Sequence, residues 1–340
     1  MDRTITLRDV ASKAEVHPST ASRALNERTR TLVNATTVAR VLAAAEDLGY
    51  QPNALAQGLK VNRTMTVGML VPDLTNPLFP PIVRGIEDRL TDAGCTLLVA
   101  NTDNDETKER SILDVMARRR VDGLIVATAQ REHPVLMTLL RSDYPVVLVN
   151  RTIDDPPLPS VGGDDHVGIG LAVRHLAGLG HRRIAHLAGP RELSTGLTRH
   201  QSFLTWMETV ELPVDPDLIV FCSWFTQQAG ATAFRELLAR DVEFTAVVAA
   251  NDLVALGCYD VAGEQGLAIP DDVSVVGYND MPFTDRFAPP LTSVRIPHYD
   301  IGVKAAELIL DQIEQPGSPG MSLRLPPELR ARGSTAAARR

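Results

Sequence analysis

From residue 64 onward, short apolar runs alternate with amphipathic helical segments, and this alternation restricts the possible fold more than any other feature of the chain. Runs suited to buried parallel strands occur at Thr66–Val71, Thr96–Ala100, Gly123–Ala127, Val146–Val149, Arg183–Ala188, Ala246–Ala250 and Val273–Gly277. Helical patterns lie between them, at Pro81–Ala93, Thr107–Arg119, Val167–Leu179, Arg199–Thr209, Gln228–Ala239 and Leu253–Gln265. Repeated strand–helix units predict a doubly wound, parallel α/β fold.

The number of predicted strands favours two lobes over one sheet. Similar halves begin near Thr66 and Arg183. We therefore expect a two-lobed body over residues 64–333, with one lobe formed by about 64–163 and 295–333 and the other by 164–294. Ligands of such folds bind outside the carboxyl ends of the strands, which predicts a binding cleft between the lobes. The polar tail, Ser334–Arg340, is expected to be disordered.

Residues 1–50 contain no strand-like run and are predicted to form three short helices. The first covers Leu7–Lys13, the second begins at Pro18 and ends near Leu25, and the third runs from a cap at Asn34 to Leu48. Proline suits a first helical position because the missing N–H has no partner there. Two helices of about seven residues joined by a four-residue turn have the spacing of a helix-turn-helix DNA-binding domain. Residues 51–63 are predicted to be a linker.

The charge distribution agrees with DNA binding by the first part of the chain. The net charge is -8, but residues 1–63 hold nine Lys/Arg and six Asp/Glu, a net of +3, which leaves -11 for the remainder. A basic head on an acidic body is expected when only one end of a protein meets phosphate.

Several function classes lack support in the sequence. No apolar run is long enough for a membrane span, and the N-terminus lacks a signal-peptide pattern, so we expect a cytoplasmic protein with no membrane partner. The three cysteines are far apart, which favours a reducing compartment. The motifs GxxxxGK[ST], GxSxG and HExxH are absent, as is a strand-linked GxGxxG, so we expect no enzyme. Five histidines lack metal-ligand spacing and are expected at surfaces or caps; these are His166, His175, His181, His186 and His200.

A set of ordered motifs resembles the LacI/GalR family of bacterial repressors. The stretches are LRDVASKAEVHPSTASRALN (7–26), VLAAAEDLGYQPNALAQGLK (41–60), VGMLVPDLTNPLF (67–79), VDGLIVA (121–127), VVAANDLVALG (247–257), IPDDVSVVGYNDMPF (269–283) and PPLTSVRIP (289–297). The resemblance implies a homodimeric transcription repressor that binds a palindromic operator in double-stranded DNA under the control of a small-molecule effector. An activator or dual regulator on the same scaffold, or a solute-binding receptor without a DNA role, remain alternatives.

The resemblance also implies how the DNA is read. The second helix would lie in the major groove, with Pro18, Ser19 and Arg23 facing base edges. Phosphate contacts would come from Thr20, Ser22, Asn26, Asn34 and Thr37. The chain departs from the family pattern at Glu15, where a turn glycine is customary, at His17, where a serine cap is usual, and at Val38, where arginine is usual.

Residues 53–60 match the hinge helix of the family, which folds only on operator DNA. Leu59 matches the leucine that wedges between base pairs in the minor groove, and such a wedge bends the duplex. Lys60, Asn53 and Ala56 are assigned to the same groove.

For the effector cleft, the resemblance implies a lining from both lobes. The first lobe would supply Leu78, Phe79, Asp73, Asn76 and Asn150, and the second Arg199, Trp224, Asn251, Asn279 and Asp280. Amides, acids, an arginine and an indole face suit a sugar or sugar phosphate, with a nucleoside or purine as the alternative; no cofactor or metal is expected. Whether the ligand induces or corepresses stays open. A dimer is favoured over a tetramer because Glu328–Arg340 shows no leucine heptads.

Overall fold

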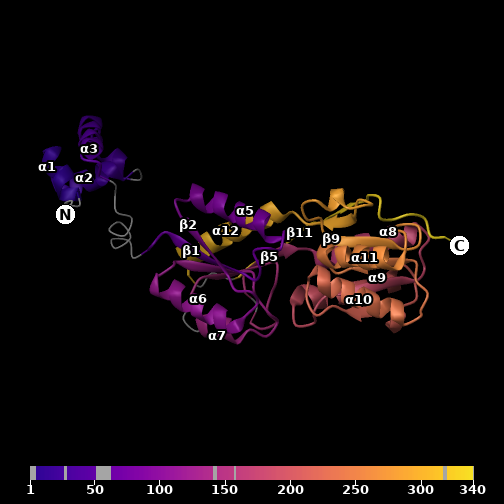
Figure 1. Cartoon of the computed structure of the whole chain (residues 1–340). Helices are drawn as coiled ribbons and strands as arrows, with labels where there is room; N and C mark the ends of the chain where they lie inside the picture. The colour runs from indigo at the N-terminus through magenta and orange to yellow at the C-terminus, as the bar shows by residue number, and fades with distance from the viewer. Residues whose placement is uncertain are drawn as a thin grey trace. The chain divides into compact units, whose positions relative to one another are not determined.

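The computed structural model describes residues 5–26, 29–50, 63–140, 144–156, 158–316 and 320–339. The chain divides into two units, Met1–Thr64 and Met65–Arg340. Figure 1 shows the first as a cluster of helices and the second as two sheets with helices on both faces of each. Within the described residues, no helix is both long enough and apolar enough to cross a membrane.

The first unit holds the three predicted helices: α1 (Leu7–Lys13), α2 (Pro18–Leu25) and α3 (Ala35–Asp47), with a 3-10 turn, η1 (Arg30–Leu32), before the third. Their bounds follow from local chemistry. The backbone N–H of Thr6 donates to the Asp9 carboxylate at the start of α1 (2.8 Å), and Asn34 Oδ1 accepts from the Thr37 N–H at the start of α3 (2.8 Å). Such contacts satisfy N–H groups that have no partner inside the helix. The core consists mainly of small side chains, which let the helices pack closely: Val10, Ala11, Ala14, Ala21, Ala24, Val41, Ala44 and Ala45.

Glu15, in the turn between α1 and α2, has a φ of 50°. This left-handed conformation is the one expected at a position where glycine is customary. A residue with a Cβ adopts it only at a steric cost in free energy.

The first lobe of the second unit is a parallel sheet in the order β11-β5-β4-β3-β1-β2. Its strands are β1 (Thr66–Val71), β2 (Thr96–Asn101), β3 (Gly123–Val126), β4 (Val146–Val149), β5 (Ser160–Gly163) and β11 (Ser322–Leu325). Helices α5 (Phe79–Asp92) and α12 (His298–Glu314) share a core with one face, and α6 (Glu106–Arg118) and α7 (Pro134–Leu140) share a core with the other (Figure 1). Successive residues of a strand point to opposite faces, so Val147 and Val149 pack on the first side and Val146 and Leu148 on the second.

The second lobe repeats this plan in the order β12-β10-β9-β8-β6-β7. Its strands are β6 (Ile184–Ala188), β7 (Ile219–Phe221), β8 (Ala246–Ala249), β9 (Ser274–Asn279), β10 (Thr292–Arg295) and β12 (Glu328–Arg330). One face packs against α8 (Asp165–Gly178) and α9 (Ser194–Thr209), and the other against α10 (Gln227–Ala239) and α11 (Asp252–Gln265). Short 3-10 turns, η2 (Pro216–Leu218) and η3 (Thr284–Arg286), precede β7 and β10. All strand pairs are parallel except β10 with β12. The two sheets match the predicted doubly wound, two-lobed α/β body.

The chain passes between the lobes three times, and the third passage differs from the expectation. The segment 295–333 was assigned to the first lobe, but β12 pairs with β10 in the second sheet, with Val294 opposite Leu329. The third passage therefore lies between β11 and β12. The assignment was wrong for residues 328–333 because β12 has three residues and an alternating exposed pattern that does not resemble a buried strand.

The C-terminal tail was also predicted incorrectly. Ser334 is fully buried; its Oγ donates to the carbonyl of Val275 (2.6 Å) and accepts from the N–H of Thr292 (2.7 Å). Farther along, the N–H of Ala338 donates to the carbonyl of Leu179 (2.9 Å). The tail is ordered because its backbone and one hydroxyl satisfy polar groups of the second lobe.

Candidate functional site

The exposed face of α2 carries four of the residues predicted to meet DNA. Ser19, Ser22, Arg23 and Asn26 are spaced by three and four residues, which places them on one side of a helix. The opposite side holds Ala21 and Ala24, both fully buried. The packing therefore sets the orientation of α2 and leaves a polar face with an arginine directed away from the core.

The start of α2 is held by His17. Its Nδ1 accepts from the N–H of Ser19 (3.3 Å) and lies 2.8 Å from Ser19 Oγ. The histidine thus takes the capping role in place of serine, because an unprotonated ring nitrogen is also an acceptor.

The remaining predicted phosphate contacts lie at helix starts. The N–H of Thr20 donates to the carbonyl of His17 (2.8 Å), and Asn34 and Thr37 meet at the cap of α3. Val38 packs against the core of this unit, and the Arg30 Nε donates to the carbonyl of Ala24 (3.1 Å) near the end of α2. The hinge residues Asn53, Ala56, Leu59 and Lys60 lie outside the described residues.

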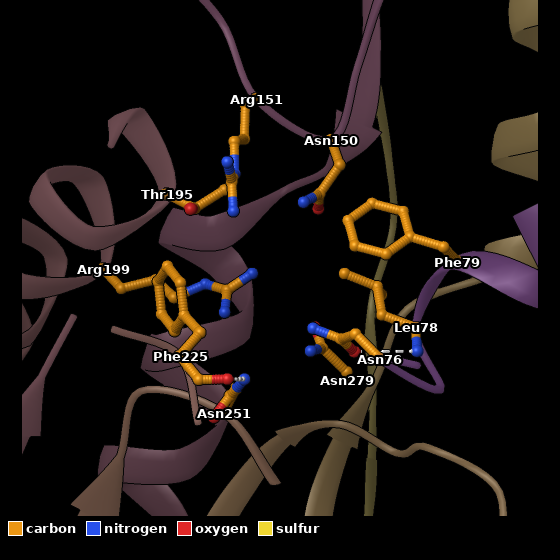
Figure 2. Close-up of a pocket in the computed structure, with 10 residues that line it drawn as sticks. All are labelled: Asn76, Leu78, Phe79, Asn150, Arg151, Thr195, Arg199, Phe225, Asn251 and Asn279. Carbon is orange, nitrogen blue, oxygen red and sulfur yellow. Dashed lines mark hydrogen bonds between the residues drawn. The ribbon is translucent and has the colours of Figure 1, made fainter. Parts of the chain in front are cut away.

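A second site lies in the α/β unit, where both lobes line a small cavity (Figure 2). Its lining residues lie at or after the carboxyl ends of strands, or at the start of the helix that follows one: Asn76, Leu78, Phe79, Asn150, Arg151, Thr195, Arg199, Phe225, Asn251 and Asn279. Strand ends meet at one edge of each parallel sheet, and the two edges face each other here.

Seven of the ten residues predicted for the cleft line this cavity, and three do not. Asp73 Oδ1 instead accepts from the N–H of Thr75 in the turn after β1 (2.8 Å). Asp280 pairs with Arg332 (2.7 Å). Trp224 is 42% exposed and lines a separate depression beside α10. Its neighbour Phe225 takes the place in the cavity that was predicted for the indole.

Three lining residues were missing from the sequence-based prediction: Arg151, Thr195 and Phe225. Arg151 directly follows a predicted cleft residue, so the turn after β4 could have pointed to it. Thr195 is the second residue of α9, which begins at Ser194. The sequence predicted that this helix begins at Arg199, five residues later. Helix starts beyond the periodic apolar pattern are poorly marked in a sequence.

Arg199 is fixed by a set of strong contacts. Its Nε donates to Asp165 Oδ1 (2.8 Å), its Nη1 donates to the carbonyl of Ala250 (2.7 Å), and its guanidinium lies 3.9 Å from the Tyr278 ring centroid. The side chain is 3% exposed. These contacts hold one edge of the guanidinium against the second lobe, and Figure 2 shows its end directed into the cavity.

Arg151 is the second guanidinium of the cavity, and Figure 2 shows it extending toward the same space as Arg199. It is 7% exposed. Among the described residues, no hydrogen-bond partner is found for its Nε and Nη1. Burial, and then the positive charge of Arg199, lower the pKa of Arg151 to about 10, so it remains charged at neutral pH.

The amides of the cavity divide into two groups. Asn251 and Asn76 also serve the backbone: Asn251 Oδ1 accepts from the N–H of Val254 (2.8 Å) as the cap of α11, and Asn76 Oδ1 accepts from the N–H of Leu78 (3.0 Å). Asn279 differs, because its buried Oδ1 has no partner among the described residues. Asn150 and Asn279 have φ values of 65° and 106°, so both turn the chain sharply at strand ends. Strained backbone of this kind is common at binding sites.

Asp252, the first residue of α11, is fully buried beside the cavity wall. Its Oδ1 accepts from Ser293 Oγ (2.5 Å) and its Oδ2 from the N–H of Met281 (2.8 Å). Burial raises the pKa of Asp252 to about 7 although both hydrogen bonds lower it. The carboxyl organises the ends of β9 and β10.

No group of three or more metal-ligating His, Cys, Asp or Glu side chains is found among the described residues. Two of the histidines expected at surfaces or caps are buried instead. His181 is 2% exposed, and its ring nitrogens lie 2.8 Å from Thr245 Oγ1 and 3.0 Å from the carbonyl of Ala336. His186 is fully buried. Its Nδ1 lies 2.9 Å from the carbonyl of Val248, and its ring stacks on Phe203. A neutral imidazole fits there because burial lowers the pKa of His186 to about 3.

Comparison with known proteins places both sites in a wider context. Residues 6–53 match the family model "Bacterial regulatory proteins, lacI family", and residues 64–332 match "Periplasmic binding proteins and sugar binding domain of LacI family". The HTH-type transcriptional repressor PurR of Photobacterium profundum is 33% identical over 330 residues, 97% of this chain and 98% of the relative. The lac repressor dimer bound to operator and the anti-inducer ONPF is similar in structure, with a TM-score of 0.85, 26% identity, and coverage of 98% of this chain and 100% of that one. The complex of the transcriptional regulator CelR with cellobiose has a TM-score of 0.76, 30% identity, and coverage of 97% and 99%.

Proposed function

Because the chain belongs to the LacI family of bacterial regulatory proteins, we propose that it is a transcription repressor that binds a palindromic operator as a homodimer and changes its operator affinity when a small molecule occupies the cavity between its lobes. It is a DNA-binding regulator and acts by binding, not by catalysis. Its place of action is the cytoplasm, where the bacterial chromosome lies. One observation carries the proposal: a single chain holds an exposed polar face on α2 and, in a separate unit, a cavity lined by polar and aromatic side chains from two lobes.

On DNA, α2 enters the major groove with its Ser19–Asn26 face toward the bases. Arg23 is the residue suited to reading guanine, since its planar fork can donate to O6 and N7 together. Ser19 and Pro18 contact neighbouring base edges, and Thr20, Ser22, Asn26, Asn34 and Thr37 contact phosphates and set the register. Residues 53–60 extend the contact into the minor groove, where Leu59 wedges between base pairs.

In the α/β unit, the ligand bridges the lobes because its binding groups come from both. Leu78, Phe79, Asn76 and Asn150 hold it from the first lobe, and Arg199, Asn251 and Asn279 from the second. A ligand shifts a conformational equilibrium only through its different affinities for the two states. A molecule held by both lobes stabilises the conformation in which the lobes are closed. A coupling free energy of about 1–3 kcal/mol between effector binding and operator binding changes operator affinity about 5- to 150-fold.

The experiment that tests this proposal is operator selection with the full-length protein. Random double-stranded DNA is enriched on the protein, and the selected sequence is titrated by fluorescence polarisation with and without a panel of sugars, sugar phosphates, sugar acids and nucleosides. We expect a palindromic site, two protomers per site, and at least one compound that changes the affinity fivefold or more. Loss of affinity with the compound identifies an inducer, and gain identifies a corepressor.

Two other outcomes are informative. A selected site from which the protein increases transcription in a purified system would make it an activator on the same scaffold. Ligand binding with no site-selective DNA affinity would make it a solute receptor and overturn the proposal.

A further inference from the structure

We infer that the effector is an anionic, hydroxylated small molecule, either a sugar phosphate or a sugar acid, held by Arg151 and Arg199; this inference rests on the proposed function of the cavity. It names the ligand class, which the family assignment leaves open.

The first argument is the charge of the lining. Arg151 and Arg199 are both at the cavity wall, and no carboxylate is among the described lining residues, whose other polar groups are four amides and one hydroxyl. Asp165 neutralises Arg199 through the 2.8 Å contact between Oδ1 and Nε. Arg151 has no comparable partner among the described residues.

The second argument is that nearby carboxyl groups are committed elsewhere. Glu109 is buried and raises the pKa of Arg151 by its charge, but its Oε1 accepts from Thr128 Oγ1 (2.6 Å) and its Oε2 lies 3.4 Å from His133 Nε2. Asp280 pairs with Arg332, and Asp252 accepts two hydrogen bonds. None of these carboxyl groups is hydrogen-bonded to Arg151, whose Nε and Nη1 have no partner among the described residues.

The third argument is the geometry of the two guanidiniums. Both extend into the same space from opposite lobes, Arg151 after β4 and Arg199 from α9 (Figure 2). A buried guanidinium whose N–H groups are unpaired is unfavourable, and an anion in the cavity would satisfy Arg151 with short, charge-assisted hydrogen bonds. Arginine suits this role because its planar donors match the oxygens of phosphate and carboxylate.

The remaining lining explains why the ligand is hydroxylated. The Oδ1 of Asn279 is a buried acceptor with no partner among the described residues, so it suits an O–H donor. Asn150 offers a further amide, and the rings of Phe79 and Phe225 offer apolar walls against which the C–H face of a sugar packs. A neutral sugar can also accept hydrogen bonds from Arg151 through its hydroxyl oxygens, but only an anion compensates the charge of the guanidinium as well.

Asn150 provides the sharpest variant, because Asn150→Asp adds a carboxylate beside both arginines with almost no change in volume. We expect it to abolish the preference for anionic over neutral ligands. Arg151→Gln removes one cation from the cavity. Arg174→Gln is the matched control, since Arg174 is exposed on α8, with its guanidinium over Trp206, and does not line the cavity.

The test measures binding to the full-length protein by thermal shift and calorimetry. Inorganic phosphate is compared with sodium chloride at equal ionic strength. Each neutral sugar is compared with its anionic derivatives: glucose with glucose 6-phosphate and gluconate, and ribose with ribose 5-phosphate. We expect saturable stabilisation by inorganic phosphate, and at least tenfold tighter binding of one anionic compound than of its neutral parent. The phosphate and carboxylate arms distinguish the two kinds of anion. Arg151→Gln and Asn150→Asp should each reduce the preference at least tenfold, and Arg174→Gln should not.

Two results would overturn the inference. The first is that inorganic phosphate stabilises the protein no more than sodium chloride does and that every neutral parent binds as tightly as its anion. The second is that the preference for anions survives in Asn150→Asp. Circular dichroism shows whether Arg151→Gln is folded; if it is not, Asn150→Asp alone decides. A neutral sugar that changes operator affinity would refute the inference and leave the proposed function standing. If an anion binds in a manner that depends on Arg151 but no ligand changes operator affinity, the proposed function is refuted and the preference of the cavity for anions stands.

Discussion

Arg199 and Asp165 form a buried ion pair between α9 and α8, with 2.8 Å between Nε and Oδ1 and side chains 3% and 13% exposed. The pair joins two helices on one face of the second sheet and directs the rest of the guanidinium into the cavity. A residue assigned to ligand binding thus also holds the lobe together, which changes how its substitution must be designed.

Replacing Arg199 alone should therefore affect stability as well as effector binding. In Arg199→Gln, Asp165 is left buried without its partner, and we expect a loss of about 3 kcal/mol in the free energy of unfolding. The double variant Arg199→Gln/Asp165→Asn should recover more than half of that loss, because no charge stays unpaired. Urea denaturation measures both. The effector response should be absent in both proteins, and a response that persists in the folded double variant would remove Arg199 from the ligand site.

Arg23→Ala should relax base preference at one position of each half-site. The expected loss is about 1–3 kcal/mol on the selected operator, with little change on operators already mutated at that position. Polarisation titrations with single-base variants of the operator measure this, and Arg286→Ala, an exposed arginine of the other unit, is the control. An equal loss on every operator variant would show that Arg23 contacts phosphate.

Glu15→Gly should stabilise the helical unit by about 0.5–1 kcal/mol, because glycine adopts a φ of 50° without the steric cost that a Cβ imposes. Hydrogen exchange of the amides of α1, α2 and α3 in the full-length protein measures the change. Glu15→Gln removes the same charge but keeps the Cβ, so it should show no such gain; equal stabilisation by both variants would mean that charge, and not backbone strain, is responsible.

Ser334→Ala should destabilise the α/β unit by about 1–3 kcal/mol, because the N–H of Thr292 and the carbonyl of Val275 would lose a buried partner. Ser223→Ala, at an exposed serine, should stay within about 0.5 kcal/mol of the wild type in urea denaturation. Equal stability of the two variants would mean that the tail contributes nothing to the fold.

Asp252 should give the stability a pH dependence of known sign. Its pKa is about 7 in the folded chain against an ordinary value of 3.8. Between these values the folded chain holds a proton that the unfolded chain has released, so this contribution is largest below about pH 4 and falls as the pH rises to 7, by on the order of 1 kcal/mol per pH unit. Asp252→Asn should lack it.

The measurement is the difference in unfolding free energy between wild type and Asp252→Asn at pH 5, 6, 7 and 8. Buried histidines such as His186 titrate in both proteins, so their effect cancels in the difference. The unfolding free energy of the wild type should fall relative to that of the variant between pH 5 and 7, and the difference between them should stay constant above about pH 7. A constant difference over the whole range would show that Asp252 ionises normally.

Much of the fold could be predicted from the sequence, because the signals involved act over a few residues. The bounds of α1 and α2 agree with the prediction, since Thr6, Pro18 and the spacing of buried alanines mark them locally. The strands β1 and β4 also agree, since each is a short apolar run buried on both faces. The short, partly exposed β11 and β12 carry no such run and were not predicted.

Sequence patterns alone predict the class of the fold and the position of the helix-turn-helix, because side-chain periodicity and capping depend on near neighbours. Most of the polar residues at the strand ends were predicted from the resemblance to the LacI/GalR family. Tertiary packing, by contrast, brings Phe225 and not Trp224 to the cavity, places Arg151 beside Arg199 there, and returns the tail to the second lobe. These facts depend on contacts between segments tens to more than a hundred residues apart, and on which polar groups remain unpaired once the lobes are packed. No local pattern records either.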